Sequence, residues 1–409
     1  MRNNFLATMI VLAVATVMAT GCGSVNTDTS ETKKIQETTA ETEGTTAKAD
    51  EPTTEKPTTE EPLQTSEADE ARYYYELGRS YLYGTDGNEI DYETAHANFI
   101  LAEEMGYTDA NFYIGVLYDW YDYPTSDFVA ARECYEKCEG NPYAQICLGL
   151  LYMNAQGVEE DMERAKELFQ SAVDQGCVEG YCGFASIARA ENDYATALEY
   201  YNKALEGTET LFITSIMNII GNMYCNGNGV EQDYSKALEW FEKGADLRSR
   251  VSMFNVGYMY YGGYGVEQDC SKALVFFEKS ADLGYVDSMN YAGDIYYYGI
   301  GGEGDYSKAL EWYEKGAENG NGYSMRQIGF MYFYGDGVEQ DYSKAFEWFE
   351  KGTEAGDDVS TNQLGDLYYN GLGAEQDYLK ALELFEKASE MGNMEGRKNA
   401  FLLRDMLGE

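Results

Sequence analysis

The fold of this chain is decided by a stretch that recurs along it, most clearly at residues 227–241, with the sequence GNGVEQDYSKALEWF. A short apolar segment with a central glycine precedes each copy, as in Ile220-Gly221-Asn222-Met223-Tyr224. These marker glycines are Gly78, Gly115, Gly149, Gly183, Gly221, Gly257, Gly293, Gly329 and Gly365. The last five follow one another at intervals of 36 residues, and the earlier steps are 37, 34, 34 and 38. Such a period predicts a protein built from stacked helical repeats.

Each copy has two halves with helical periodicity. In residues 233–243, Ala237, Leu238 and Phe241 recur at helical spacing and form a core stripe. The aspartate before that stripe is predicted to cap the helix through its carboxylate. The predicted caps are Asp233, Asp269, Asp305, Asp341 and Asp377. Paired glycines between the halves, such as Gly227 and Gly229, supply the positive φ angles of a tight helix exit. The marker glycine costs its helix about 1 kcal/mol relative to Ala, which predicts close approach of the paired helix at its small residues.

On these motifs the chain resembles the Sel-one-like repeat (SLR) family, a relative of the tetratricopeptide repeat. The Gly-x-Gly-Val loop, the Asp-Tyr-x-Lys-Ala-Leu start and the Trp-Phe-x-Lys end are strongest over 210–392 and weaker over 107–209. The fourth copy has Ala190-Glu191-Asn192-Asp193 in place of the loop. The resemblance implies an all-α fold over 70–409: a right-handed α-solenoid of about nine helix–turn–helix repeats, period 34–38, with a C-terminal cap at 393–409. It also implies an adaptor or scaffold with a concave binding groove.

The amino terminus has the pattern of an export signal. An apolar run, Phe5–Ala19, is too short for a typical membrane span and ends in Gly21-Cys22-Gly23-Ser24. This pattern resembles a bacterial lipoprotein cleavage site, although Ala19 stands where Leu is usual. We therefore expect a signal peptide at 1–21, lipidation of Cys22, and an extracytoplasmic, membrane-anchored protein at the bacterial surface or in the periplasm. The alternative is an ordinary secretory signal with an incidental cysteine.

The segment 22–69 is rich in Thr, Glu and Pro and has almost nothing apolar to bury. We expect it to be a disordered tether between the lipidated cysteine and the repeats. The whole chain contains 72 acidic residues and 29 Lys and Arg residues, which gives a net charge of −43. Such a surface disfavours nucleic acid and anionic lipid headgroups and leaves basic peptides, divalent cations or neutral polymers open. The simplest interpretation is that the charge keeps the protein soluble.

Candidate partner-binding residues come from the resemblance, because tetratricopeptide geometry places positions three before, one after and four after the marker glycine on the groove side. The candidates at the first two positions are Asn218, Asn222, Phe254, Tyr258, Asn290, Asp294, Arg326, Phe330, Asn362 and Asp366. The third position holds Cys225, Tyr261, Tyr297, Phe333 and Tyr369. Carboxamides and aromatic faces suit an extended peptide or a sugar polymer. The alternative for the aromatic residues is packing between repeats, so the Asn and Asp positions are the better candidates.

Motifs for catalysis and for cofactors are missing from the sequence. His96 is the single histidine, and no phosphate loop, zinc signature or nucleophile elbow is present. The Glu-Gln-Asp loops lack calcium-loop spacing, so helix capping is the better interpretation. We expect no enzyme activity, cofactor or metal. The seven cysteines beyond Cys22 are Cys134, Cys138, Cys147, Cys177, Cys182, Cys225 and Cys270. Cysteine-rich relatives bridge helices with seven residues between the pair, a spacing absent here, which favours buried thiols with at most one or two disulfides.

Two functions from different classes follow. The first is a non-catalytic scaffold that binds a protein or peptide in the solenoid groove. The alternative is a surface receptor for cell-wall or host glycans. A polymer hydrolase is disfavoured because the acidic residues repeat at capping and surface positions rather than forming one exceptional pair. The identity of the partner, the envelope type and the role of the irregular copies at 107–209 stay open.

Overall fold

The structure is a computed structural model, and it describes residues 67–85, 87–119, 127–207 and 212–408. The expected signal peptide, the lipidation site Cys22 and nearly all of the tether lie outside these residues. Every regular element in the described ranges is a helix, nineteen in all, and none is long and apolar enough to span a bilayer. The chain divides into two units, 1–232 and 233–409, which are described separately here.

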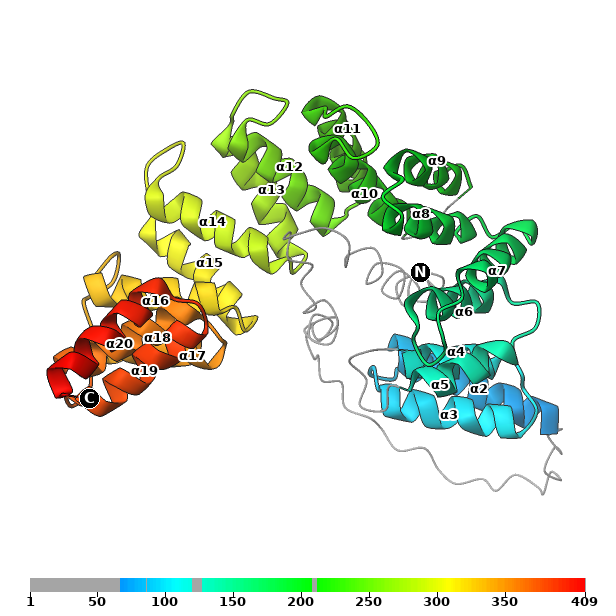
Figure 1. The fold of residues 1–409 in the computed structure, drawn as a ribbon, viewed down its shortest axis with the longest axis horizontal. Helices are drawn as coiled ribbons and strands as arrows, with labels where there is room; N and C mark the ends of the chain where they lie inside the picture. The colour runs from blue at the N-terminus through cyan, green and yellow to red at the C-terminus, as the bar shows by residue number, and fades with distance from the viewer. Residues whose placement is uncertain (1–66, 86, 120–126, 208–211, 409) are drawn as a thin grey trace, which may run out of the picture. The chain divides into compact units, whose positions relative to one another are not determined.

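Unit 1 contains nine helices (Figure 1). They are α2 (Glu67–Tyr83), α3 (Tyr92–Glu104), α4 (Ala110–Asp119), α5 (Phe128–Glu136), α6 (Pro142–Asn154), α7 (Met162–Asp174), α8 (Gly180–Ala190), α9 (Tyr194–Leu205) and α10 (Phe212–Asn226). Unit 2 contains ten helices. They are α11 (Tyr234–Asp246), α12 (Arg250–Gly262), α13 (Cys270–Asp282), α14 (Val286–Tyr298), α15 (Tyr306–Glu318), α16 (Gly322–Tyr334), α17 (Tyr342–Glu354), α18 (Asp358–Asn370), α19 (Tyr378–Glu390) and α20 (Met394–Leu407).

Within each unit, consecutive helices pack on one another as hairpins. We call the even-numbered helices A helices and the odd-numbered ones B helices; the marker glycines lie on the A helices α2 to α18. Within a unit, an A helix packs on the B helix that follows it and on the B helix before it, as α16 does with α17 and α15. The all-α solenoid expected from the sequence is confirmed, while the hand of its superhelix stays a prediction.

The predicted helix caps and loop glycines are confirmed. The carboxylate of each predicted capping aspartate accepts a hydrogen bond from a backbone N–H in the first turn of its B helix, as in Lys236 N to Asp233 Oδ1 at 3.0 Å. Gly227 and Gly229 have φ angles of +70° and +73°. In the fourth copy, Asn192 takes φ +61° in a short turn between α8 and α9. The local sequence therefore sets where each helix begins and ends.

The marker glycine meets an aromatic ring, which corrects the expectation of small residues on its own B helix. A Cβ atom at Gly329 would lie 2.7 Å from the Phe349 ring, and one at Gly293 would lie 2.5 Å from the Tyr313 ring. Both rings are fully buried. Full burial of such a ring contributes about 1.5–3 kcal/mol, which exceeds the cost of glycine in a helix, about 1 kcal/mol.

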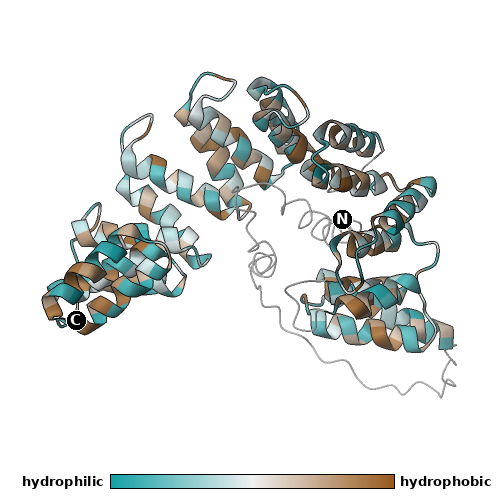
Figure 2. Ribbon diagram, viewed as in Figure 1, coloured by the Kyte–Doolittle hydropathy of each residue, from teal (hydrophilic) through white to brown (hydrophobic). Residues whose placement is uncertain are grey.

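Small residues do meet in unit 2, but between a B helix and the A helix of the next repeat. A Cβ atom at Gly316 would lie 2.0 Å from Ser324 Oγ, and one at Gly352 would lie 2.3 Å from Ser360 Oγ. The apolar residues lie mainly along the contacts between helices, and polar residues cover the outer faces (Figure 2). Large–small complementarity inside a repeat and small–small contact between repeats thus produce the stack.

Candidate binding surface

The predicted binding residues belong to both units. Asn218 and Asn222 lie on α10 in unit 1, and the other eight lie on A helices α12, α14, α16 and α18 of unit 2. Asn218 is buried, and its Nδ2 donates to Thr214 O at 2.9 Å, whereas Asn222 is exposed. Eight of the ten predicted residues therefore lie within one unit, unit 2.

In unit 2, the residues three before the marker glycine contact the next repeat. Asn290 Oδ1 accepts from Ser324 Oγ at 2.6 Å. Arg326 Nη1 forms an ion pair with Asp357 Oδ1 at 2.9 Å.

Further along the same face, Asn362 Oδ1 accepts from Asn399 Nδ2 at 3.1 Å. Phe254 is buried among aromatic rings that include Phe277 and Tyr285. These four positions make inter-repeat contacts in this structure, so partner binding by them stays a prediction.

The residues one after the marker glycine are more accessible. The Tyr258 ring is 39% exposed and stacks against the Tyr264 ring at 5.7 Å between centroids. Phe330 is half-buried and stacks on Tyr334 at 6.0 Å. Asp366 is half-buried, and its Oδ2 accepts from Asn362 Nδ2 at 3.4 Å. The position one after the glycine therefore offers accessible side chains to a ligand. The position three before the glycine does not, because its side chains contact the next repeat.

Asp294, at the same position on α14, anchors a polar network. Its Oδ1 accepts from the Tyr313 hydroxyl at 2.7 Å and from the Tyr323 hydroxyl at 2.8 Å. Burial raises the pKa of the Asp294 carboxyl above its ordinary value, although the hydrogen bonds from both tyrosines oppose that shift. Burial, followed by repulsion from Glu395, raises the pKa of Asp366 to about 6. Both carboxyl groups are thus kept partly out of water beside the accessible rings.

Sequence reasoning missed the two most exposed rings on this face. Tyr298 and Tyr334 are 61% and 60% exposed and lie five residues after their marker glycines. That position is one helical turn beyond the position one after the glycine, so its residues lie on the same face. Asn370, which is also exposed, occupies it on α18. The position five after the glycine could have been found from the sequence, because it recurs in the repeat one helical turn after the position one after the glycine.

We call the resulting surface the inner-helix row. It comprises Tyr258, Asp294, Tyr298, Phe330, Tyr334, Asp366 and Asn370. Neighbouring A helices contact each other beside the row, as Tyr258 on α12 does with Tyr291 on α14. Aromatic faces attract cations, and carboxylates and amides pair with basic side chains or with peptide groups. The row contains no basic side chain, which disfavours an anionic ligand.

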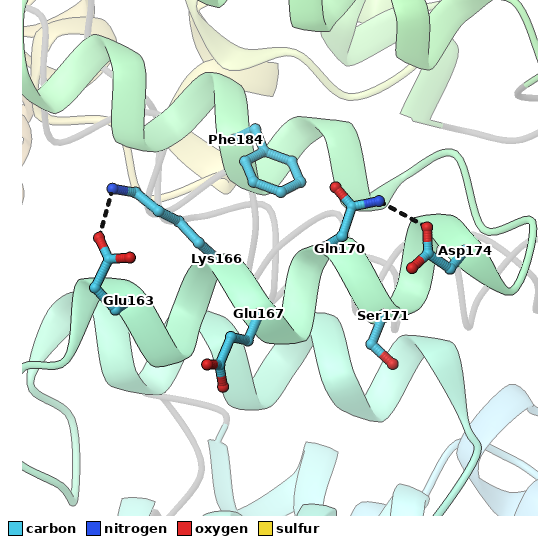
Figure 3. Close-up of a pocket in the computed structure, with 7 residues that line it drawn as sticks. All are labelled: Glu163, Lys166, Glu167, Gln170, Ser171, Asp174 and Phe184. Atoms are coloured by element: carbon cyan, nitrogen blue, oxygen red, sulfur yellow. Dashed lines mark hydrogen bonds and ion pairs between the residues drawn. The ribbon is translucent and has the colours of Figure 1, made fainter.

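A shallow depression in unit 1 lies over α7 and α8 (Figure 3). Its polar side chains pair with each other, since Lys166 Nζ contacts Glu163 Oε1 at 3.0 Å and Gln170 Nε2 donates to Asp174 Oδ1 at 2.7 Å. Phe184 contributes an apolar wall. Across the described ranges, no group of three or more His, Cys, Asp or Glu side chains could hold a metal ion.

The seven cysteines within the described residues are free thiols. Burial raises the pKa of Cys134 and Cys225 to about 11, and that of Cys138 and Cys182 to about 12. Thiols with a raised pKa are weak nucleophiles at neutral pH. His96 packs edge-to-face on Tyr118 at 4.8 Å, and burial lowers its pKa. Burial is thus the first cause of the pKa shift of these four thiols and of His96.

The fold and surface described above define a class: helical-repeat proteins that present a row of side chains along stacked A helices. The chain belongs to the Sel1 repeat family. The family model matches residues 71–107, 142–177, 180–208, 217–249, 250–285, 286–321, 322–357 and 359–393. The copy around Gly115 lies between matched ranges. Sel1 repeat proteins are generally scaffolds for protein interaction, and the fold is typically non-catalytic.

Two solved structures illustrate the similarity. A protective antigen of uropathogenic Escherichia coli with an SLR fold is 27% identical, with 82% of this chain and 88% of that chain covered and a TM-score of 0.43. A Sel1 repeat protein from Oxalobacter formigenes is 29% identical, with 54% and 96% covered and a TM-score of 0.46. The comparison with curated proteins gave no match.

Proposed function

We propose that this chain is a lipid-anchored, extracytoplasmic scaffold that holds an extended basic segment of a partner protein along the inner-helix row. Scaffolding is the general role of the family. The lipoprotein-like site at Cys22 supports the location, and the charge balance of −43 supports a basic partner.

The observation that carries the proposal is the exposure of Tyr258, Tyr298 and Tyr334 at recurring positions on successive A helices. Each exposed ring can contribute about 0.5–1 kcal/mol to the binding of a Lys or Arg side chain. Three such contacts supply about 1.5–3 kcal/mol, so carboxylates and main-chain hydrogen bonds must supply the rest. A ligand with basic residues spaced along an extended backbone meets all of these requirements.

Peptide binding to the full chain in detergent tests the proposal. Fluorescent peptide pools, sorted into basic, neutral and acidic sets, are titrated against wild type and against the triple variant Tyr258→Ala, Tyr298→Ala, Tyr334→Ala. We expect the basic pool to bind, binding to weaken with salt, and the triple variant to lose about tenfold in affinity, or 1.4 kcal/mol.

The matched control is Tyr73→Ala on α2, where an equally exposed ring (61%) lies in unit 1. It should bind the basic pool as wild type does. Equal binding by the wild type and the triple variant would refute the inner-helix row as the site. Retention of purified cell-wall polymer with no peptide binding would support the glycan receptor instead.

A further inference from the structure

The last helix of unit 2 has a different residue type at the position that holds the marker glycine in the preceding repeats. Counting 36 residues on from Gly365 gives Phe401, which lies in the A helix α20. In the preceding repeats a Cβ atom at the marker glycine would lie 2.9 Å from the Phe277 ring or 2.7 Å from the Phe385 ring of the paired B helix. A phenylalanine there occupies the space that the B-helix ring fills elsewhere. A B helix with a ring at the usual position would therefore clash with Phe401.

A second position at this end departs from the repeat in the same direction. Residues 235, 271, 307 and 343 are serines, and the fifth member of the series is Leu379. Ser235 Oγ donates to Gly265 O in the loop of the following repeat at 3.0 Å, so this position faces the next repeat. Leu379 is 66% exposed, and Phe401 is 72% exposed. Here the position that elsewhere meets its own B helix and the position that elsewhere contacts the following repeat are both apolar and exposed.

The uncovered surface continues along α20, and its apolar residues are visible near the C-terminal end in Figure 2. Met394, Leu402 and Met406 are 70%, 55% and 52% exposed. The opposite side of the helix packs on α19 through Ala400 and Leu403. A run of exposed apolar side chains of this kind marks an interaction surface.

Charges on this face make it complementary to itself. Met394, Lys398, Phe401 and Asp405 follow one another at intervals of four, three and four residues, the spacing of a helix–helix seam. In a parallel pair of these helices, Lys398 would meet Lys398 and Asp405 would meet Asp405, which is repulsive. In an antiparallel pair centred between Phe401 and Leu402, each Lys398 meets Asp405 of the partner subunit. A two-fold interface requires such self-complementarity.

We propose that α20 is the interface of a homodimer, in which two copies of the chain pack this face antiparallel about an axis between Phe401 and Leu402. The apolar side chains around the axis leave water, and an ion pair between Lys398 and Asp405 of the partner subunit flanks them on each side. The Lys398 Nζ–Glu395 Oε1 contact at 3.3 Å is exposed, so Lys398 can change partner at little cost. This inference stands independently of the inner-helix row.

Cysteine cross-linking in the full chain tests the geometry. Leu402→Cys places a thiol beside the proposed axis and keeps Phe401, while Glu383→Cys places one on the exposed face of α19 as the matched control. Under mild oxidation we expect a covalent dimer of the Leu402→Cys chain at a yield at least about tenfold above the control. Equal yields would overturn the proposal, because they would reflect chance encounters in a shared micelle.

A charge swap tests the orientation. Lys398→Glu, placed in the Leu402→Cys chain, sets two carboxylates against each other and should reduce the cross-linked fraction several-fold. Adding Asp405→Lys should restore it, because opposite charges meet again across the axis. These residues lie seven apart on one helix, so the rescue cannot arise within one chain. Helix content and thermal midpoint are measured for each variant, and absence of rescue in folded variants would refute the antiparallel pairing.

Discussion

At the scale of single residues, the repeat register gives one position different chemical environments in different copies. The position one after the marker glycine holds Tyr258, Asp294, Phe330 and Asp366. The two aspartates are half-buried in a row of aromatic rings, and burial is the first cause of the raised pKa of each. For an acid, a folded-state pKa above the ordinary value means that the native state favours the protonated form. These carboxylates therefore oppose folding once they ionise.

Asp366→Asn tests this cost. The pKa of Asp366 rises from 3.8 to about 6 in the folded chain, so its destabilising effect is absent below about pH 4 and complete above about pH 6. We expect the variant to have a higher thermal midpoint than wild type at pH 7, and the difference to vanish at pH 4. Asp246→Asn, at an exposed position of α11, is the control and should show no such pH-dependent gain. A constant difference across the range would contradict the assignment.

At the scale of elements, the marker glycine decides how closely an A helix approaches its own B helix. Replacing glycine by alanine in a helix normally gains about 1 kcal/mol in propensity. Here the added Cβ would meet a buried ring at less than 3 Å, and overpacking in a filled core costs about 1–3 kcal/mol. The steric term is the larger, so the sign of the substitution reverses.

Gly329→Ala should therefore lower the thermal unfolding midpoint of the full chain. The Phe349 ring, 2.7 Å from the new Cβ, must shift or the helices must part. Adding Phe349→Leu to this variant should recover part of the loss, because the smaller side chain leaves room. Gly302→Ala serves as the control, since a Cβ there has nothing within 4 Å. An unchanged or higher midpoint for Gly329→Ala would show that the helix pair accommodates the methyl group.

At the scale of the whole molecule, the chain joins a repeat array in two units to an amino-terminal segment with the pattern of an export and lipidation signal. Under the proposed function, a lipid anchor at Cys22 would confine the binding surface to one compartment. A single acyl chain gives only marginal binding, whereas several chains on one cysteine hold a protein firmly.

Cys22→Ser should release the protein from the membrane fraction and abolish incorporation of a labelled fatty acid. Cys225→Ser, at a half-buried thiol on α10, is the matched control and should leave both unchanged. Cell fractionation with immunodetection gives the distribution, and gel fluorography gives the label. Continued membrane attachment of Cys22→Ser without label would show that the apolar segment Phe5–Ala19 itself retains the chain.

The sequence by itself determined the repeat, because the marker glycines, the capping aspartates and the paired loop glycines are local requirements that recur at a fixed period. Asp233 and Gly227 could be assigned from their neighbours alone, since a cap and a positive φ depend on the adjacent backbone. The C-terminal cap that the family resemblance implied at 393–409 contains the helix α20 (Met394–Leu407).

Only the tertiary structure decided what the side chains between the local signals do. Asn290 and Arg326 resembled ligand contacts in the sequence, yet they bond to Ser324 and Asp357 across helices, because partners more than 30 residues away share the same surface. Tyr298, Tyr334 and Phe401 became candidates because their side chains are exposed in the folded chain. Binding and packing use the same residue types here, and spatial neighbours alone separate the two roles.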